Sequence, residues 1–138
     1  MLGAFFLWDG SRLEPVLTGK GPSGLVPSVD VKGLTPVNIA RLGDLLGVAS
    51  YDAVIAQCGR KHRESDTRQS GVWQIPAAVG GALRGSRNLE PLAERWAATE
   101  ELRRDGWTAS HGLDVLSRLA ELLTHQERRQ ELWYWWSV

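Results

Sequence analysis

The sequence predicts an α+β fold in which a small antiparallel sheet, with paired N- and C-terminal strands, packs against several helices. Two observations support this prediction. The chain begins and ends with short aromatic runs, GAFFLWDG and LWYWWSV, which would place apolar side chains on both faces of a strand. The segments between them show helical periodicity with start and stop residues. A length of 138 residues fits one globular domain over residues 1–138.

The first predicted element is a strand near the N-terminus. Phe5, Phe6 and Trp8 favour extended backbone, and Asp9-Gly10 closes the run as a turn. Residues 17–28 are dense in glycine and proline and are predicted to form a loop. A second, short strand is predicted within residues 28–32.

Two helices with clear end signals follow. Thr35 is the predicted N-cap of the first helix, Pro36 is its first residue, and Gly47 lies just past its end. Ser50 is the predicted N-cap of the second helix, and Gly59 is predicted to end it. The apolar residues of the first helix that are expected to face the core are Val37, Ala40, Leu42, Leu45 and Leu46.

The middle of the chain is polar. The stretch RKHRESDTRQSG has no apolar anchor, so residues 60–70 are predicted to form an exposed, mobile loop. Residues 72–76 are predicted to form a short strand that Pro76 ends. For residues 77–86 helix and loop stay open, because the apolar spacing is helical but three glycines weaken a helix.

Two further helices are predicted in the C-terminal part. One is expected over residues 88–106, with Asn88 as its cap. The other lies within residues 110–130 and has the clearest periodicity of the chain. Its predicted apolar stripe consists of Leu113, Leu116, Leu119, Ala120 and Leu123.

The period changes at the aromatic C-terminus. A strand would place Leu132, Tyr134 and Trp136 on one face and Trp133 and Trp135 on the other. A helix would instead spread the rings around its circumference, so a strand paired with the N-terminal one is favoured. One face is expected to pack on the helix within residues 113–130. So short a chain is not expected to cover both faces, which would leave an exposed aromatic strip for a second copy, as a homodimer, or for another protein.

Composition limits the function classes. Sixteen basic and sixteen acidic residues give zero formal net charge, which makes nucleic-acid binding improbable as a function. The single cysteine rules out an intrachain disulfide and fits a reducing compartment. The N-terminal apolar run is too short for a signal peptide, and no run reaches the length of a membrane span. We therefore expect a cytoplasmic protein without a membrane partner.

The reactive side chains give no specific signature. Cys58 and His62 are four residues apart, but a lone cysteine at the end of an apolar helix is usually a buried hydrophobe, so neither is predicted to be catalytic. The three histidines have no ligand partner at metal-site spacing, and neither a metal nor a cofactor is expected. Glu94, Glu100 and Glu101 are interpreted as a solvated helix face.

Seven tryptophans are more than one small core is expected to hold, so some should line an interface or a pocket. The candidate binding residues are Trp73, Trp96, Trp107, Trp133 and Trp135. The favoured hypothesis is a non-enzymatic protein-interaction domain, such as a homo-oligomer, adaptor or inhibitor, that uses an aromatic surface. The alternative is a small-molecule-binding protein, or an enzyme, with a tryptophan-lined pocket. A closed, concave pocket that holds several tryptophans and a buried carboxylate would favour the alternative, and a flat exposed aromatic patch would favour the first hypothesis.

The segments DVKGLTPVNIARLGDLLGV and YWWSV together resemble a family of small uncharacterised bacterial proteins that share these two ends. The resemblance covers a minor part of the chain. It implies a single bacterial domain and carries no activity with it.

Overall fold

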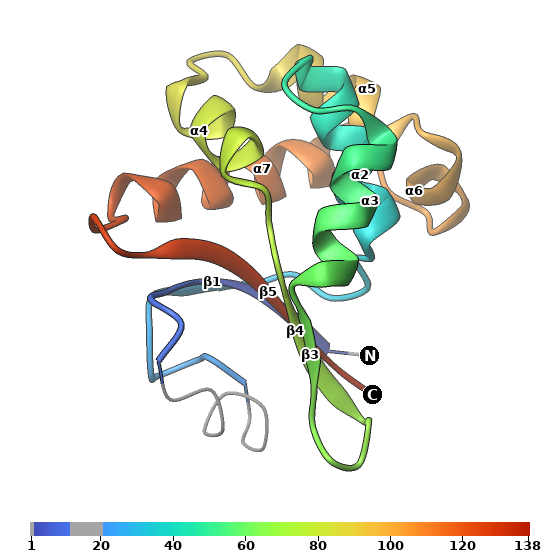
Figure 1. The fold of residues 1–138 in the computed structure, drawn as a ribbon. Coiled ribbons are helices and arrows are strands. Elements are labelled where there is room, and N and C mark those ends of the chain that lie inside the picture. The colour runs from blue at the N-terminus through green and yellow to red at the C-terminus, as the bar shows by residue number, and fades with distance from the viewer. Residues whose placement is uncertain (1, 12–20) are drawn as a thin grey trace.

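The computed structural model describes residues 2–11 and 21–138, and in them it shows the predicted α+β architecture. A five-stranded antiparallel sheet has the strand order β2-β1-β5-β4-β3 (Figure 1). Its strands are β1 (Leu2–Trp8), β2 (Ser28–Asp30), β3 (His62–Glu64), β4 (Ser70–Gln74) and β5 (Glu131–Ser137). The described helices are α2 (Pro36–Leu46), α3 (Tyr51–Arg60), α4 (Ala77–Gly85), α5 (Glu90–Ala97), α6 (Glu100–Arg104) and α7 (Ala109–Thr124).

The two ends of the chain pair as predicted. β1 and β5 run antiparallel over their whole lengths, from Leu2 opposite Ser137 to Trp8 opposite Glu131. β5 also pairs with β4, so it is the central strand of the sheet. The aromatic C-terminus therefore joins the two halves of the sheet.

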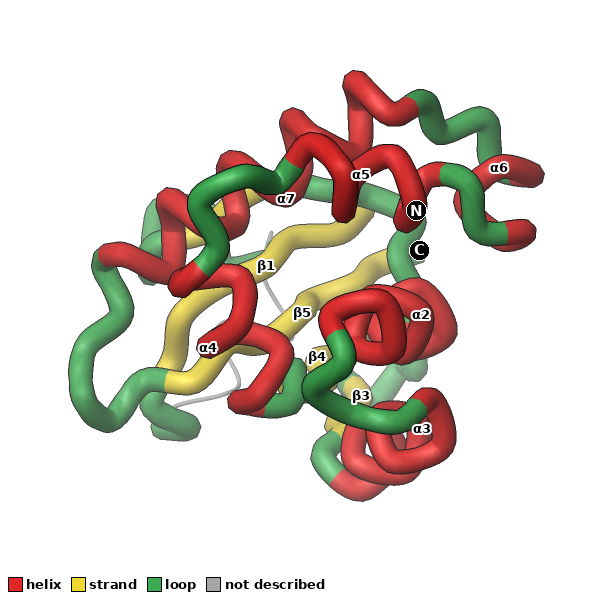
Figure 2. The backbone as a smooth tube through the Cα atoms, turned by 90° about the horizontal axis from the view of Figure 1, so that it is seen from above, coloured by secondary structure: helices red, strands yellow, loops and turns green. Residues whose placement is uncertain are grey.

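The helices form a layer on one face of this sheet (Figure 1). Seen from above, α7 lies on the β1 side of the sheet, whereas α2 and α3 lie toward β4 and β3 (Figure 2). The residues of α7 that are buried in the core are Gly112, Val115, Leu116, Leu119, Leu122 and Leu123. Leu113 and Ala120, which were expected in this stripe, are only partly buried. The helix is thus rotated slightly from the predicted orientation.

Both predicted ends of α2 are confirmed, whereas for α3 the predicted start is confirmed and the predicted end is not. Thr35 precedes α2, Pro36 is its first residue, and Gly47 ends it with a left-handed φ of 71°. The Ser50 side chain accepts a hydrogen bond from the Ala53 N–H at 3.2 Å and so caps α3. The prediction that Gly59 ends α3 is wrong. The helix continues to Arg60, because glycine in a helix costs only about 1 kcal/mol relative to alanine.

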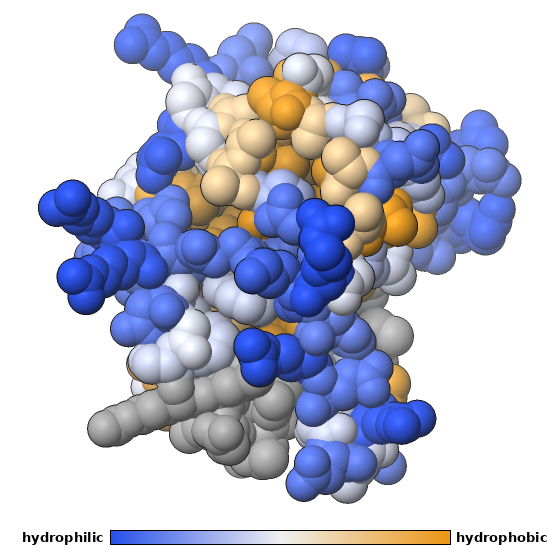
Figure 3. Space-filling model, in the orientation of Figure 1, coloured by the Kyte–Doolittle hydropathy of each residue, from blue (hydrophilic) through white to orange (hydrophobic). Residues whose placement is uncertain are grey.

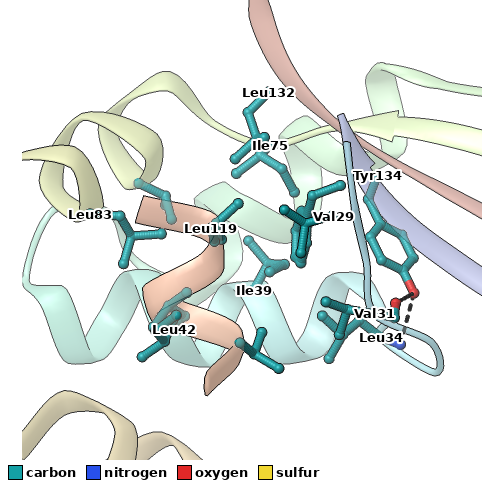
Figure 4. Close-up of a cluster of buried hydrophobic side chains, with 14 of the residues drawn as sticks. Val29, Val31, Leu34, Ile39, Leu42, Ile75, Leu83, Leu119, Leu132 and Tyr134 are labelled. Carbon is teal, nitrogen blue, oxygen red and sulfur yellow. Dashed lines mark hydrogen bonds between the residues drawn. The ribbon is translucent and has the colours of Figure 1, made fainter. Parts of the chain in front are cut away.

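The core of α2 also differs from the predicted stripe. Ile39, Ala40 and Leu42 are buried, whereas Val37, Leu45 and Leu46 are only partly buried. Ile39 and Leu42 of α2 and Leu119 of α7 belong to the main core, which lies between the helices and the sheet (Figure 4).

The single helix predicted over residues 88–106 is two helices, α5 and α6. Thr99 has extended backbone, with φ −61° and ψ 150°, and its hydroxyl donates to the Trp96 carbonyl at 2.6 Å. A threonine hydroxyl that donates to the backbone carbonyl of the preceding helical turn competes with the backbone hydrogen bonds that would continue the helix. The ambiguous residues 77–86 form α4, in which the three glycines are tolerated.

The polar middle segment contains an edge strand. β3 pairs with β4 from His62 opposite Trp73 to Glu64 opposite Gly71. The expectation of a loop over residues 60–70 is therefore wrong for residues 62–64, because backbone hydrogen bonds to β4 compensate for the missing apolar anchors. It is also wrong at the two ends, since Arg60 belongs to α3 and Ser70 to β4. The segment is nonetheless mostly exposed, and its mobility stays a prediction.

The face of the sheet opposite the helices is not left open. Here we define the far-face cluster as the buried residues Ala4, Phe6, Trp8, Val72, Trp133 and Trp135. The segment that connects β1 to β2 reaches this cluster through Val26 and Gly21. Residues 12–20 of the chain, which include the start of the predicted 17–28 loop, lie outside the described residues, and residues 21–27 form turns.

The exposed aromatic strip expected on β5 is therefore absent. Trp133 and Trp135 are only 7% and 4% exposed in a single chain, because the second face is covered by this chain itself. The homodimer stays a prediction, but the surface from which it was inferred is buried.

Candidate functional site

The five predicted binding tryptophans do not form one site. Trp96 is fully buried under α2, where its indole N–H donates to the Asn38 carbonyl at 2.9 Å. Trp107 packs edge to face against the Trp96 ring, with ring centroids 5.3 Å apart. Trp133 and Trp135 lie in the far-face cluster. Of these five, Trp73 lines a pocket of ligand size that is formed by described residues.

That pocket, which we call the indole pocket, lies between the start of α2, α3 and the β3–β4–β5 edge of the sheet. Its volume is about 430 Å³. It is lined by Leu34, Thr35, Pro36, Ile55, Cys58, Gly59, His62, Trp73 and Trp136. Two indole rings, an imidazole and aliphatic side chains thus come together from five elements and the loop that precedes α2.

Trp136 enters the pocket wall because of the glycine opposite it. Gly71 is the partner of Trp136 across β4 and β5, and a Cβ added to Gly71 would lie 2.7 Å from Cζ2 of the Trp136 ring. The indole therefore lies across the β4 backbone and reaches β3. From the sequence, Trp136 was expected to share one face of the C-terminal strand with Leu132 and Tyr134, but no site role was predicted for it, since nothing local links Gly71 to it.

His62 completes this wall from the edge strand. Its ring stacks on Trp136 with centroids 6.0 Å apart and an interplanar angle of 23°. The Trp136 indole N–H donates to Nε2 of His62 at 3.3 Å, so Nε2 carries no proton in this arrangement. Nδ1 lies 3.8 Å from Oε1 of Glu64. The imidazole is therefore held through Nε2 and ring stacking, whereas the contact of Nδ1 with Glu64 is too long for a hydrogen bond.

Tyr134 fixes the opposite wall without entering the pocket. Its hydroxyl donates to the Val31 carbonyl at 2.7 Å and accepts from the Leu34 N–H at 3.2 Å (Figure 4). Leu34 is a lining residue, so the central strand sets the position of this part of the pocket. Burial raises the pKa of Tyr134 to about 12, and the hydroxyl stays a proton donor at neutral pH.

Cys58 contributes a neutral thiol to the lining. The side chain is 1% exposed, and Sγ donates to the Gln74 carbonyl at 3.7 Å. Burial raises the pKa of the Cys58 thiol to about 11. Nucleophilic cysteines need the thiolate, whereas Cys58 is protonated at neutral pH. That Cys58 is not catalytic stays a prediction.

The carboxylates weighed as candidates lie on the surface. Glu101 binds Arg41 with Oε1 2.8 Å from Nε, and this hydrogen bond lowers the pKa of the Glu101 carboxyl. Glu100 pairs with Arg104 at 2.8 Å on the same exposed helix. Neither group lines the indole pocket. Among residues 2–11 and 21–138, no cluster of three or more potential metal ligands occurs.

Two indole N–H groups of the far-face cluster have no hydrogen-bond partner in the described part of the chain. They belong to Trp133 and Trp135 and are buried. A buried donor without an acceptor costs about 1–3 kcal/mol. Burial of this face therefore leaves the indole N–H groups of Trp133 and Trp135 without the hydrogen bonds that they would make to water in the unfolded chain.

No aromatic side chain is among the large hydrophobic residues that are exposed in the described segments. The large hydrophobic residues that are exposed in the described segments are Leu2, Leu25, Val48 and Val138, of which Leu2 and Val138 lie at the same end of the β1–β5 pair. On the face seen in Figure 3, hydrophilic side chains surround the apolar residues that show over the helices. None of the described helices is both long enough and apolar enough to cross a bilayer.

Comparison of the chain with family models, curated proteins and solved structures gives no match in any of the three. The resemblance to small bacterial proteins therefore stays an expectation from the sequence.

Proposed function

We propose that the protein binds a small molecule in the indole pocket and does not act as an enzyme. The observation that carries this proposal is the pocket itself. Its volume of about 430 Å³ falls within the range of roughly 300–1,000 Å³ typical of ligand sites, and its lining is predominantly apolar, as in such sites. The concave pocket with two tryptophans in its wall favours ligand binding over a flat interaction surface, although no carboxylate lines it.

The chemistry of the lining supports binding rather than catalysis. The nine lining residues include no Asp, Glu, Lys or Arg. The thiol of Cys58 is held in its protonated form by burial, which raises its pKa to about 11. Nε2 of His62 is occupied by the indole N–H of Trp136. No base or nucleophile therefore faces the cavity in the form that general acid–base or covalent catalysis requires.

The protein-interaction hypothesis depended on exposed aromatic residues. Four of the five candidate tryptophans, Trp73, Trp96, Trp133 and Trp135, are each less than 10% exposed, and Trp107 is partly buried, so most of this surface is not available on a single chain. We also propose a cytoplasmic location. The free thiol of Cys58 supports it, because unpaired cysteines are typical of reducing compartments.

Blocking the pocket from its edge tests the proposed function. Gly59 lines the pocket, and a Cβ added there would meet no atom within 4 Å. Gly59→Phe should therefore fill free volume without disturbing the core. The matched control is Gly85→Phe, since Gly85 is also an exposed helical glycine with free space around its Cβ but lies outside the pocket.

The measurement is a thermal-shift screen of small molecules against the three proteins. A ligand at about 100 times its Kd adds roughly 2.7 kcal/mol to the stability of the native state. We expect compounds that raise the Tm of the wild type and of Gly85→Phe but not that of Gly59→Phe. Compounds that stabilise all three proteins equally, or a screen in which none stabilises the wild type, would refute the proposal.

A further inference from the structure

The polar side chains of the indole pocket are already partnered within the protein. The Thr35 hydroxyl lies 3.3 Å from Oδ1 of Asn38, and the Cys58 thiol donates to the Gln74 carbonyl. His62 accepts the indole N–H of Trp136. A ligand therefore meets a wall that needs neither a donor nor an acceptor from it.

The start of α2 provides little for an anion, although it borders the pocket. The first helical residue is Pro36, which has no N–H. The N–H of Thr35 donates to Oδ1 of Asn38 at 2.8 Å, and the Asn38 N–H is directed at the Thr35 carbonyl at 3.1 Å. The donors that an anion would use are mostly absent or occupied by the helix's own cap. An ionised ligand would thus lose its hydration with little compensation.

The largest lining side chains are flat rings. Trp73 is 2% exposed and packs on Tyr134 with centroids 5.1 Å apart, so its ring is fixed in place. Trp136 is held between the backbone at Gly71 and the stacked imidazole of His62. Rings held in this way present defined surfaces for offset or edge-to-face packing, which adds about 0.5–1.5 kcal/mol per aromatic pair to the effect of burial.

We propose that the indole pocket selects uncharged, planar aromatic molecules over anionic ones and over flexible aliphatic ones. This inference rests on the proposed function, and it specifies the ligand class. The absence of lysine and arginine from the lining disfavours an anion, and the fixed rings of Trp73 and Trp136 favour a planar ligand. Recognition depends on shape and ring contact, with His62 as a specificity residue that keeps the Trp136 ring in its place.

Three small probes separate the parts of this proposal. 2-Naphthol is planar and uncharged at neutral pH, 2-naphthoate has the same ring system with a negative charge, and 1-octanol is uncharged but flexible. Titration calorimetry on the full-length protein gives the affinity of each. We expect 2-naphthol to bind at one site, and each of the other two probes to bind at least about tenfold more weakly, a difference of about 1.4 kcal/mol.

The indole N–H signals in a ¹H–¹⁵N spectrum locate the bound probe. Signals of Trp73 and Trp136 should shift with 2-naphthol, whereas that of Trp96, which is bonded to the Asn38 carbonyl beneath α2, should not. His62→Ala should weaken 2-naphthol binding at least about fivefold and leave 1-octanol binding nearly unchanged, because aromatic pairs contribute beyond burial alone. His62 lies at the exposed edge strand, so this variant should fold.

The outcomes distinguish this inference from the function on which it rests. Equal or tighter binding of 2-naphthoate would overturn the preference for uncharged molecules, and equal or tighter binding of 1-octanol would overturn the preference for rings. In both cases the pocket would still be a ligand site. Binding that leaves the Trp73 and Trp136 signals unmoved, or no binding by any of the three probes together with an empty thermal-shift screen, would overturn the proposed function as well.

Discussion

Adding a single methyl group to Gly3 should destabilise the protein strongly, although Gly3 lies in a terminal strand. A Cβ at this position would clash with the Tyr134 hydroxyl and would lie 2.6 Å from Cζ of the same ring and 2.7 Å from the Val31 carbonyl oxygen. The hydroxyl has no free space to move into, because it is bonded to the Val31 carbonyl and the Leu34 N–H. Either the tyrosine or the backbone must shift.

The magnitude follows from what is lost. Overpacking a core costs about 1–3 kcal/mol, and a buried group that loses its hydrogen-bond partner costs about 1–3 kcal/mol. Gly3→Ala regains less than about 1 kcal/mol from the reduced entropy of the unfolded chain. We therefore expect a net loss of about 2–5 kcal/mol, a large part of a typical total of roughly 5–15 kcal/mol.

A double-mutant cycle with Tyr134→Phe tests the cause as well as the size of the effect. Removing the hydroxyl removes the worst clash but also its hydrogen bonds, so Tyr134→Phe alone should cost about 1–3 kcal/mol. Gly3→Ala should cost at least about 1 kcal/mol less in the Tyr134→Phe background than in the wild type. Urea unfolding followed by circular dichroism gives the four free energies. Gly81→Ala is the control, because a Cβ there meets nothing within 4 Å.

The raised pKa of Tyr134 predicts how the free energy of unfolding depends on pH. Burial raises the pKa of Tyr134 from 10.0 to about 12, so between these values the unfolded chain loses this proton while the folded chain keeps it. The free energy of unfolding should therefore fall from about pH 10 to 12, and Tyr134→Phe should make this decline shallower.

For the double-mutant cycle of Gly3→Ala and Tyr134→Phe, additive free energies of unfolding, or a Gly3→Ala loss below about 1 kcal/mol, would refute the packing explanation.

Two further predictions concern the C-terminus and the thiol. Truncation after Gln130 removes the central strand with four buried side chains, each worth about 1.5–3 kcal/mol, and should abolish folding; a truncated chain that keeps a cooperative urea transition would contradict this. Cys58 should react slowly with a thiol reagent in the native protein at neutral pH and quickly in denaturant, because burial raises its pKa to about 11; fast native labelling would indicate an activated thiolate and reopen the enzyme hypothesis.

The elements that sequence reasoning predicted correctly are those with strong local signals. Thr35, Pro36 and Gly47 mark the ends of α2 through backbone chemistry that tertiary contacts did not override. The pairing of β1 with β5 followed from two strands with apolar residues on both faces, since such strands must be covered on both sides.

The errors arise where distant segments decide the outcome, or where a single side chain competes with the helix. Thr99 ends α5 by bonding the Trp96 carbonyl, although periodicity alone would continue the helix. The far face of the sheet is covered from within the chain, which a count of helices and strands cannot foresee. The indole pocket depends on His62 in an edge strand and on Gly71 beneath Trp136, two residues with no local pattern that connects them to a ligand site.

Three consecutive aromatic residues of β5 depend on three glycines from different parts of the chain. A Cβ on Gly3 would clash with Tyr134, and one on Gly21 would lie 2.7 Å from the Trp135 ring. A Cβ on Gly71 would lie equally close to Trp136. Because neighbouring residues of a strand point to opposite faces, the first and third rings turn toward the helices and the second turns to the far face.

The same three rings differ in what they can do for the protein. Tyr134 is fully buried and holds the chain at Val31 and Leu34, and Trp135 is buried in the far-face cluster. Trp136 alone is partly exposed and borders the indole pocket. An aromatic run that suggests one continuous binding surface therefore divides by position: two of its rings hold the sheet together, and the strand they stabilise presents the third to the ligand we propose.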